Sequence, residues 1–171
     1  MDTKTIRIAA DNPLNVEWAN ALGSFFRNFG MIEFLAMEFI VKMADGYKYK
    51  SIKKKYLSQK ITWIIENLGE HTDSPKEQVD AIIETLEEIR QLSFFRNILS
   101  HGALGLSKPG ENGKAAPEVV GILNYRPEDS DQEAEIISLE ELSGRVAESE
   151  ELVRKILDQL NGIGFTAIAQ A

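Results

Sequence analysis

The sequence predicts a mainly α-helical protein: an antiparallel four-helix bundle with a small β-hairpin inserted between helices three and four. Apolar residues recur three and four positions apart over long stretches, which is the spacing of one helix face. Short turns separate these stretches, so consecutive helices are expected to pack antiparallel. One turn-rich insertion, residues 103–137, breaks the helical pattern and contains two β-like runs.

The first predicted helix follows a loose N-terminal arm of residues 1–11. Asn12 and Pro13 are suited to a helix cap and first turn, and the helix is expected to reach about Ala44. Gly23 and Gly30 are weak points or close-packing sites within it. Its apolar seam has seven consecutive positions, namely Leu22, Phe25, Phe29, Ile32, Ala36, Phe39 and Met43.

Two further helices are predicted before the insertion. Asp45-Gly46 ends the first helix, and the second covers residues 50–69, with Leu57, Ile61, Ile64 and Leu68 on one face. The third runs from Ser74 to Gly102, with Ser74 as N-cap and Glu77 completing a capping box. Its seam contains Val79, Ile82, Leu86 and Ile89, and about 26 residues give it a length of roughly 39 Å.

After Gly102, residues 103–117 are predicted as a turn-rich loop, and residues 118–125 and 134–139 as two paired strands. A capping box of Ser138 and Glu141 then opens the fourth helix, which runs to about Asn161. Ser149 is the one polar residue on its seam, which is otherwise formed by Leu139, Leu142, Val146, Val153, Ile156 and Leu160.

Composition restricts the function. A chain of 171 residues with 43% hydrophobic content is long enough for a single domain, 1–171, with its own core. The absence of cysteine excludes disulfides and thiol catalysis. No segment has the roughly 18 consecutive apolar residues of a membrane span, and the N-terminus lacks a signal peptide's apolar run, so no membrane contact and a cytoplasmic location are expected.

The charge is unevenly distributed. Residues 1–114 carry 15 Lys/Arg and 15 Asp/Glu, whereas residues 115–171 carry 4 and 12, so the net charge of −8 comes entirely from the last third. An anionic partner is therefore expected to bind the first two thirds.

The end of the third helix carries the strongest functional signal. It reads Arg96-Asn97-Ile98-Leu99-Ser100-His101-Gly102. A structural interpretation is available, because Arg and His in a last helical turn are favoured by the helix dipole and Gly is a common stop. The combination of Asn after Arg and Gly after His, at the end of a long bundle helix, favours a functional one.

This motif and the helical plan resemble the HEPN domain family (higher eukaryotes and prokaryotes nucleotide-binding), whose members carry an Arg-x(4–6)-His signature. The resemblance implies a metal-independent RNA endonuclease acting as a dimer, with Arg96 and His101 as the catalytic pair and Asn97 beside them. It also implies a role as a toxin, defence effector or RNA-processing enzyme, with a possible antitoxin or defence partner. Some HEPN toxins have Tyr two residues after the His, where this chain has Ala103.

The residues suit this chemistry independently. Cleavage of RNA through its 2′-hydroxyl needs a base, an acid and a cation on the phosphate, which His and Arg supply without a metal or cofactor. Helical spacing puts Arg96 and His101 about 140° apart. Either the helix bends before Gly102, or the site is a composite of two chains across a two-fold axis.

A lysine-rich stretch, residues 42–60, is the predicted RNA surface. It holds seven Lys against the single acid Asp45, and the alternative is a solvated helix start. In an antiparallel bundle this stretch shares one pole with His101, whereas His71 lies at the other. The expected RNA-binding residues are Lys48, Lys50, Lys53, Lys54, Lys55, Tyr49 and Tyr56.

Two other functions remain open. The first is a non-catalytic HEPN-like bundle that binds a nucleotide, a phosphorylated ligand or a protein partner, because an Arg–His pair also binds an anion without cleaving it. The second is a helical adaptor whose seams serve oligomerisation.

Overall fold

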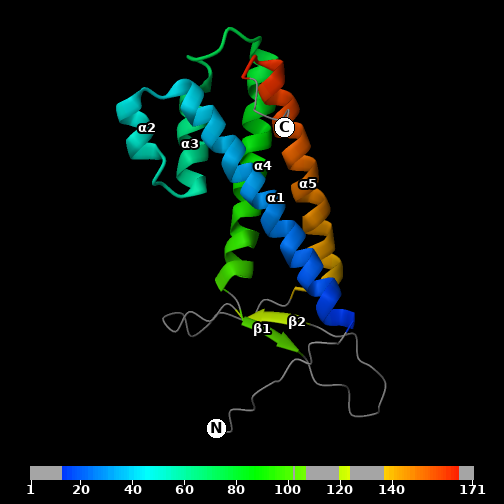
Figure 1. The fold of residues 1–171 in the computed structure, drawn as a ribbon. Helices are drawn as coiled ribbons and strands as arrows, with labels where there is room; N and C mark the ends of the chain where they lie inside the picture. Colours follow the sequence, from blue (N-terminus) through cyan, green and yellow to red (C-terminus); the bar gives the residue numbers. More distant parts are fainter. Residues whose placement is uncertain (1–12, 102, 107–119, 124–136, 166–171) are drawn as a thin grey trace, which may run out of the picture.

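The computed structural model describes residues 13–101, 103–106, 120–123 and 137–165 (Figure 1). The predicted mainly helical bundle is confirmed, and the predicted arm, residues 1–11, lies outside the described residues. The described elements are α1 (Pro13–Met43), α2 (Gly46–Ile52), α3 (Leu57–Leu68), α4 (Lys76–His101), β1 (Ala103–Leu106), β2 (Val120–Leu123) and α5 (Leu139–Gly162).

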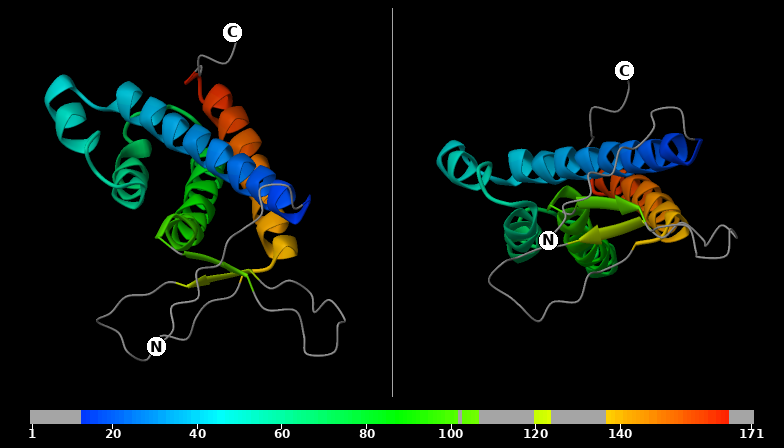
Figure 2. Two further views of the ribbon diagram at one scale, coloured as in Figure 1. Left: turned by 60° about the horizontal axis from the view of Figure 1, so that its bottom comes forward. Right: turned by 90° about the horizontal axis from the view of Figure 1, so that it is seen from below.

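Four of the helices form the body of the molecule. The longest, α1, lies across one side and packs against α5 and α3, while α4 packs between α3 and α5 on its inner side (Figure 2). The short helix α2 extends from the end of α1 at the edge of the bundle (Figure 1). Among the described residues, no helix combines the length and apolar character needed to cross a membrane.

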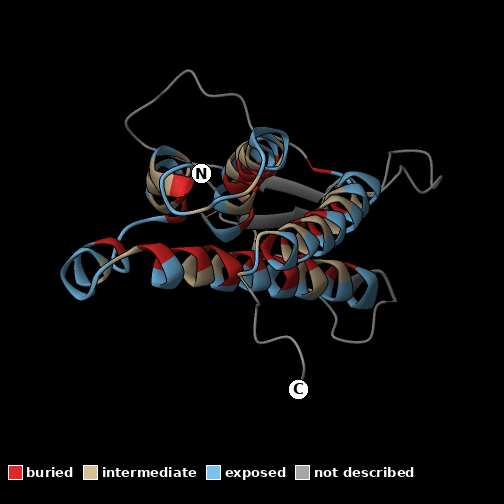
Figure 3. Cartoon of the chain, turned by 90° about the horizontal axis from the view of Figure 1, so that it is seen from above, coloured by how far each residue is buried: buried red, intermediate tan, exposed pale blue. Residues whose placement is uncertain are grey.

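Most positions of the predicted seams of α1, α3 and α4 form the core, whereas Val79 of α4 and Leu139, Val146 and Val153 of the α5 seam are half-buried. Six of the seven α1 positions are buried, the exception being the half-buried Leu22, and Phe25 and Phe39 are completely inaccessible. Figure 3 shows the buried residues of each helix facing the other helices. The four predicted α3 positions are also buried, as are Ile82, Leu86 and Ile89 of α4.

The predicted second helix, residues 50–69, is wrong in outline, because two helices occupy this region. Asp45 ends α1 but also starts α2, since its Oδ1 accepts hydrogen bonds from Tyr47 N at 3.1 Å and Lys48 N at 2.8 Å. After Ile52 the chain turns, and Tyr56 N donates to Gln59 Oε1 at 3.3 Å at the start of α3. Lys53 to Tyr56 therefore form a connection and not a helix interior.

This extra helix changes the direction of α3. Because α2 carries the chain back along the bundle, α3 runs in the same general sense as α1 and against α4 (Figure 1). Neighbouring α1 and α5 also run in parallel, since Asn28 bonds to Ser149 and Phe39 packs on Phe165. The antiparallel packing predicted for consecutive helices is thus correct for α3–α4 and α4–α5. It is wrong for α1 and α3, which correspond to the first and second predicted helices.

A polar pair sets the register of α1 against α5. Asn28 Nδ2 donates to Ser149 Oγ at 3.1 Å, and Ser149 Oγ donates to the Val146 carbonyl at 2.7 Å. Both side chains are buried, and Ser149 is the polar residue that interrupts the predicted α5 seam. A one-turn slip would leave the Asn28 amide buried without this partner, which is costly.

The two predicted caps differ in outcome. Ser138 Oγ accepts from Glu141 N at 3.0 Å, so Ser138 is the N-cap of α5 as predicted. The capping box at Ser74 is not formed, because Ser74 instead exchanges hydrogen bonds with Thr72. Helix α4 begins without that cap, through hydrogen bonds from Gln78 N and Val79 N to the Pro75 carbonyl.

The predicted hairpin of residues 118–125 with 134–139 is not what the structure shows. Strand β2 lies within the first of these segments, but it pairs antiparallel with β1, Ala103 opposite Leu123, in a region predicted as loop. Residues 134–136 lie outside the described residues, and α5 begins at Leu139. The strand Ala103–Leu106 was not predicted because it is short and contains Gly105, a residue type that is uncommon in strands.

Candidate functional site

The predicted catalytic motif occupies the last turns of α4. The helix remains α-helical to His101, so helical spacing still separates Arg96 and His101 by about 140° and the alternative of an earlier break is not seen. Arg96 is half-buried and Asn97 is exposed. The side chain of His101 lies outside the described residues.

Arg96 is held against α1 and away from bulk solvent on one side. Its guanidinium carbon lies 5.7 Å from the centroid of the Phe29 ring, and its Nη1 donates to Asn97 Oδ1 at 3.3 Å. Stacking on an aromatic face fixes the planar guanidinium without using its hydrogen-bond donors. Nε of Arg96 is buried and has no hydrogen-bond partner among the described residues.

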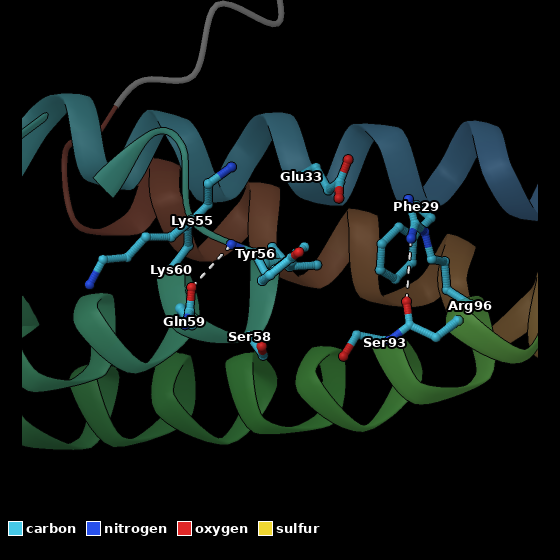
Figure 4. A pocket seen from close by; sticks show the side chains of 11 residues that line it. Phe29, Glu33, Lys55, Tyr56, Ser58, Gln59, Lys60, Ser93 and Arg96 are labelled. Carbon is cyan, nitrogen blue, oxygen red and sulfur yellow. Dashed lines mark hydrogen bonds between the residues drawn. The ribbon is translucent and has the colours of Figure 1, made fainter. Parts of the chain in front are cut away.

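A cleft of about 580 Å³ opens beside Arg96, bounded by α1, α4 and the start of α3 (Figure 4). This volume lies in the range of roughly 300–1,000 Å³ typical of small-molecule sites. Its lining residues are Phe29 and Glu33 of α1, Lys55 to Lys60 at the start of α3, and Ser93, Arg96 and Asn97 of α4.

The cleft brings together two sets of residues predicted separately. Arg96 and Asn97 come from the motif, and Lys55 and Tyr56 come from the lysine-rich stretch. They meet for a reason that the sequence pattern does not reveal. The end of α1 lies at the opposite pole from His101, and it is α2 that carries residues 53–56 back to α4.

The remaining predicted RNA-binding residues do not line the cleft. Lys48, Lys50, Lys53 and Lys54 are exposed, so a surface role remains open to them. Tyr49 is half-buried, with the Lys53 ammonium 5.6 Å from its ring centroid. Tyr56, in contrast, is 82% exposed at the cleft and presents a free aromatic face.

Several cleft residues were not predicted from the sequence. Lys60 stands in the lysine-rich stretch and could have been found from its position one turn after Tyr56, but Gln59 and Ser93 carry no distinguishing signal. Glu33 carries no such signal either, because the sequence pattern of its helix indicates only an apolar seam. In Figure 4 it projects from α1 between Tyr56 and Arg96.

The cleft is positively charged overall. Lys55, Lys60 and Arg96 line it against the single carboxylate of Glu33. None of these three cations takes part in an ion pair among the described residues. The first turn of α3, Leu57 to Gln59, also faces the cleft, and the unpaired N–H groups of a helix start favour negative charge. The arrangement can therefore bind a phosphate group.

His71, the other histidine, is exposed in the connection between α3 and α4 and lies near the end of α5, so it is at the opposite end of α4 from His101, as predicted. Within the described ranges, no group of three or more His, Asp or Glu side chains is placed to hold a metal ion.

Comparison of the chain with protein-family models, with curated proteins and with solved structures gives no significant match. The resemblance of the motif to HEPN domains therefore remains a hypothesis carried by Arg96, Asn97 and His101 alone.

Proposed function

We propose that this protein is a metal-independent RNA endonuclease of the HEPN type, with Arg96 and His101 as its catalytic pair. The observation that carries the proposal is the cleft beside Arg96, where a fixed guanidinium, two lysines and an exposed tyrosine lie together. A single-stranded RNA needs these groups: cations for its phosphates and an aromatic face for a base.

The proposed reaction is an internal transesterification. His101 takes the proton from a 2′-hydroxyl, the 2′-oxygen attacks the adjacent phosphorus, and the 5′-oxygen leaves with a proton from a second acid. The products carry a 2′,3′-cyclic phosphate and a 5′-hydroxyl. Arg96 stabilises the additional negative charge on the pentacoordinate phosphorus, as positioned cations do in phosphoryl transfer. Asn97 orients the guanidinium through its bond to Nη1.

The second acid has a natural source in a second copy of the chain. Because Arg96 and His101 diverge by about 140° at helical spacing, we propose a homodimer in which the site is a composite of two chains. A cytoplasmic location and an antitoxin or defence protein as a further partner belong to the same hypothesis.

The deciding experiment incubates the protein with single-stranded RNA in excess chelator. Cleavage that yields 2′,3′-cyclic phosphate ends, spares DNA and is lost in His101→Ala supports the proposal. Asn97→Ala is expected to weaken activity but not abolish it, since an amide positions groups without transferring a proton. Metal-dependent hydrolysis that leaves 5′-phosphates contradicts the mechanism.

One alternative is supported by the same cleft. Its volume suits a single nucleotide, and one chain supplies all of its lining, so a non-catalytic bundle that binds a nucleotide or phosphorylated ligand is the second candidate. A thermal shift with nucleoside phosphates, without any RNA cleavage, would favour it.

A further inference from the structure

The outer face of α1 is unusually apolar for a surface helix. Of the large hydrophobic side chains that are exposed in the described part of the chain, five lie on this helix: Val16, Phe26, Met31, Phe34 and Val41. Figure 3 shows α1 at one edge of the molecule, with exposed residues on the side away from the other helices. Single exposed hydrophobics need no explanation, but a contiguous strip marks an interaction surface.

The middle of this strip is a narrow line of six positions along α1, with Phe26 and Met31 on either side of it. Its positions fall within a sector of about 60° on a straight helix and span about 38 Å. They are Val16, Gly23, Arg27, Gly30, Phe34 and Val41, all of them exposed. A Cβ atom placed at either glycine would have nothing within 4 Å, so neither glycine is required by packing inside the chain. Two glycines inside a helix lower its stability, and no close contact with the described residues requires either of them.

The geometry points to a second copy of this chain as the occupant, with the two α1 helices packed antiparallel about a two-fold axis between Asn28 and Phe29. In that register each position i faces position 57 − i of the partner. Phe34 then lies over Gly23 of the partner, and Val16 meets Val41. A large side chain opposite a glycine is the fit that lets two helices approach closely.

Charge also favours this orientation. Glu17 and Lys42 are both exposed and lie on the same flank of α1, at opposite ends of the strip. An antiparallel copy brings each Glu17 to the partner's Lys42 end, which forms two equivalent attractive pairs. Arg27 faces Gly30 of the partner, where its aliphatic stem has room and its charged head can reach water.

A parallel copy fits less well. It would place each residue of the strip beside itself, so that two Arg27 side chains meet and glycine stands opposite glycine. The first is repulsive and the second leaves gaps between the helices. The self-complementary pattern of an isologous contact therefore exists only in the antiparallel arrangement.

The size of the strip sets the expected affinity. A strip about 38 Å long and about 10 Å wide covers roughly 400 Å² in projection, below the roughly 800 Å² of accessible surface that each partner buries in a standard interface. We expect a dimer that forms at micromolar concentration. The inference does not rest on ribonuclease activity. Phe29, beneath Arg96, lies about 130° around α1 from the strip, so this contact is separate from the one that would complete the composite site at the end of α4.

The orientation can be tested by cross-linking, because the chain has no cysteine of its own. Under mild oxidation, the double variant Val16→Cys, Val41→Cys should form a covalent dimer, whereas either single variant should not. The two positions are too far apart to join within one chain. A covalent dimer from Val16→Cys alone would overturn the antiparallel register, as would the absence of any dimer in the double variant.

A second test uses a variant that strengthens the fold and weakens the dimer. Gly23→Leu replaces a helix-interior glycine in open space, so the Tm of the monomer should rise by about 2–4 °C. It also fills the position that receives Phe34, so dimer affinity by sedimentation should fall at least about tenfold. Gly144→Leu, at an equally open and exposed position on α5, is the matched control and should raise Tm without changing affinity. An unchanged dimer in Gly23→Leu, or a wild-type chain that stays monomeric at about 100 μM, would overturn the inference.

The charge pairs give an independent check. Glu17→Lys and Lys42→Glu should each weaken the dimer, and combining them should restore it, because the swap recreates both pairs with reversed sign. If the loss of dimer affinity in the double variant equals the product of the two single fold-changes, these two residues do not meet in the dimer.

Discussion

The guanidinium of Arg96 lies over the ring of Phe29, with its carbon 5.7 Å from the ring centroid. This contact joins α4 to α1 at the wall of the cleft and fixes the cation predicted to act on phosphate. Phe29 is a buried seam residue, so the core itself positions the functional side chain. The Arg side chain is thus ordered before any ligand binds, which lowers the entropic cost of binding.

The variant Arg96→Lys distinguishes the contribution of the positive charge from that of the planar guanidinium group. Lysine keeps the positive charge but lacks the planar group that stacks on Phe29 and binds two phosphate oxygens at once. We expect RNA cleavage to fall about 10-fold in Arg96→Lys and by about 10²–10³ in Arg96→Ala, as when one transition-state donor is lost. Circular dichroism and Tm should stay close to wild type in both, and equal activity in Arg96→Lys would contradict a role for the stacked geometry.

Lysines at the cleft should matter more than lysines away from it. The double variant Lys55→Ala, Lys60→Ala removes two cleft cations, whereas Lys48→Ala, Lys50→Ala removes the same charge outside the cleft. Each lost phosphate contact flattens the slope of log K against log salt by about 0.7, so the cleft pair should flatten it by about 1.4. Fluorescence anisotropy with labelled RNA at several salt concentrations measures this, and equal effects of the two pairs would mean that RNA does not enter the cleft.

Glu33 is expected to limit phosphate binding. As the one carboxylate lining a cleft with three cations, it repels an entering phosphate. Glu33→Gln keeps the size of the side chain and removes the charge, so affinity for a nucleoside monophosphate should rise about 2–5-fold at low salt. Glu38→Gln, on the same helix outside the cleft, is the control. A loss of affinity in Glu33→Gln would instead indicate that the carboxylate accepts a hydrogen bond from the ligand.

The buried pair of Asn28 and Ser149 predicts a non-additive stability effect. Ser149→Ala leaves the Asn28 amide without its partner and should reduce the free energy of unfolding by roughly 1–3 kcal/mol. Ser143→Ala on the exposed side of α5 should change it by less than about 0.5 kcal/mol. Denaturant melts should show that Asn28→Leu combined with Ser149→Ala costs less than the sum of the single changes.

Mixing wild-type and His101→Ala chains tests the composite site. If each site needs histidines from both chains, activity at a fixed total concentration should fall towards the square of the wild-type fraction. A fall in simple proportion would exclude the composite site and would agree with a dimer whose clefts remain separate. The measurement therefore distinguishes two arrangements of the dimer without requiring its structure.

The long seams were predictable because burial repeats every three to four residues, as at Phe25, Phe29 and Ile32, and that repeat is visible in the sequence. The break at residues 53–56 was not, because lysines and Tyr56 give no turn signal and the cap of α3 comes from the Gln59 side chain. The pairing of β1 with β2 depends on chain segments far apart in the sequence, which periodicity cannot detect. For the same reason Glu33 was missed: only the packing of α1 on α3 and α4 brings it to the cleft.

The parallel packing of α1 on α5 has a consequence for how the chain folds. Asn28 and Ser149 are 121 residues apart, so at a synthesis rate of roughly 5–20 residues per second α1 emerges about 6–24 s before its main partner. Helices α3 and α4 are joined by a short turn and can pair as soon as they are made. Closing the longer loop costs more entropy and should come later, so we expect α3–α4 to form the nucleus. Until α5 arrives, α1 exposes both its core seam and its outer strip, which makes it the segment most in need of a chaperone during synthesis.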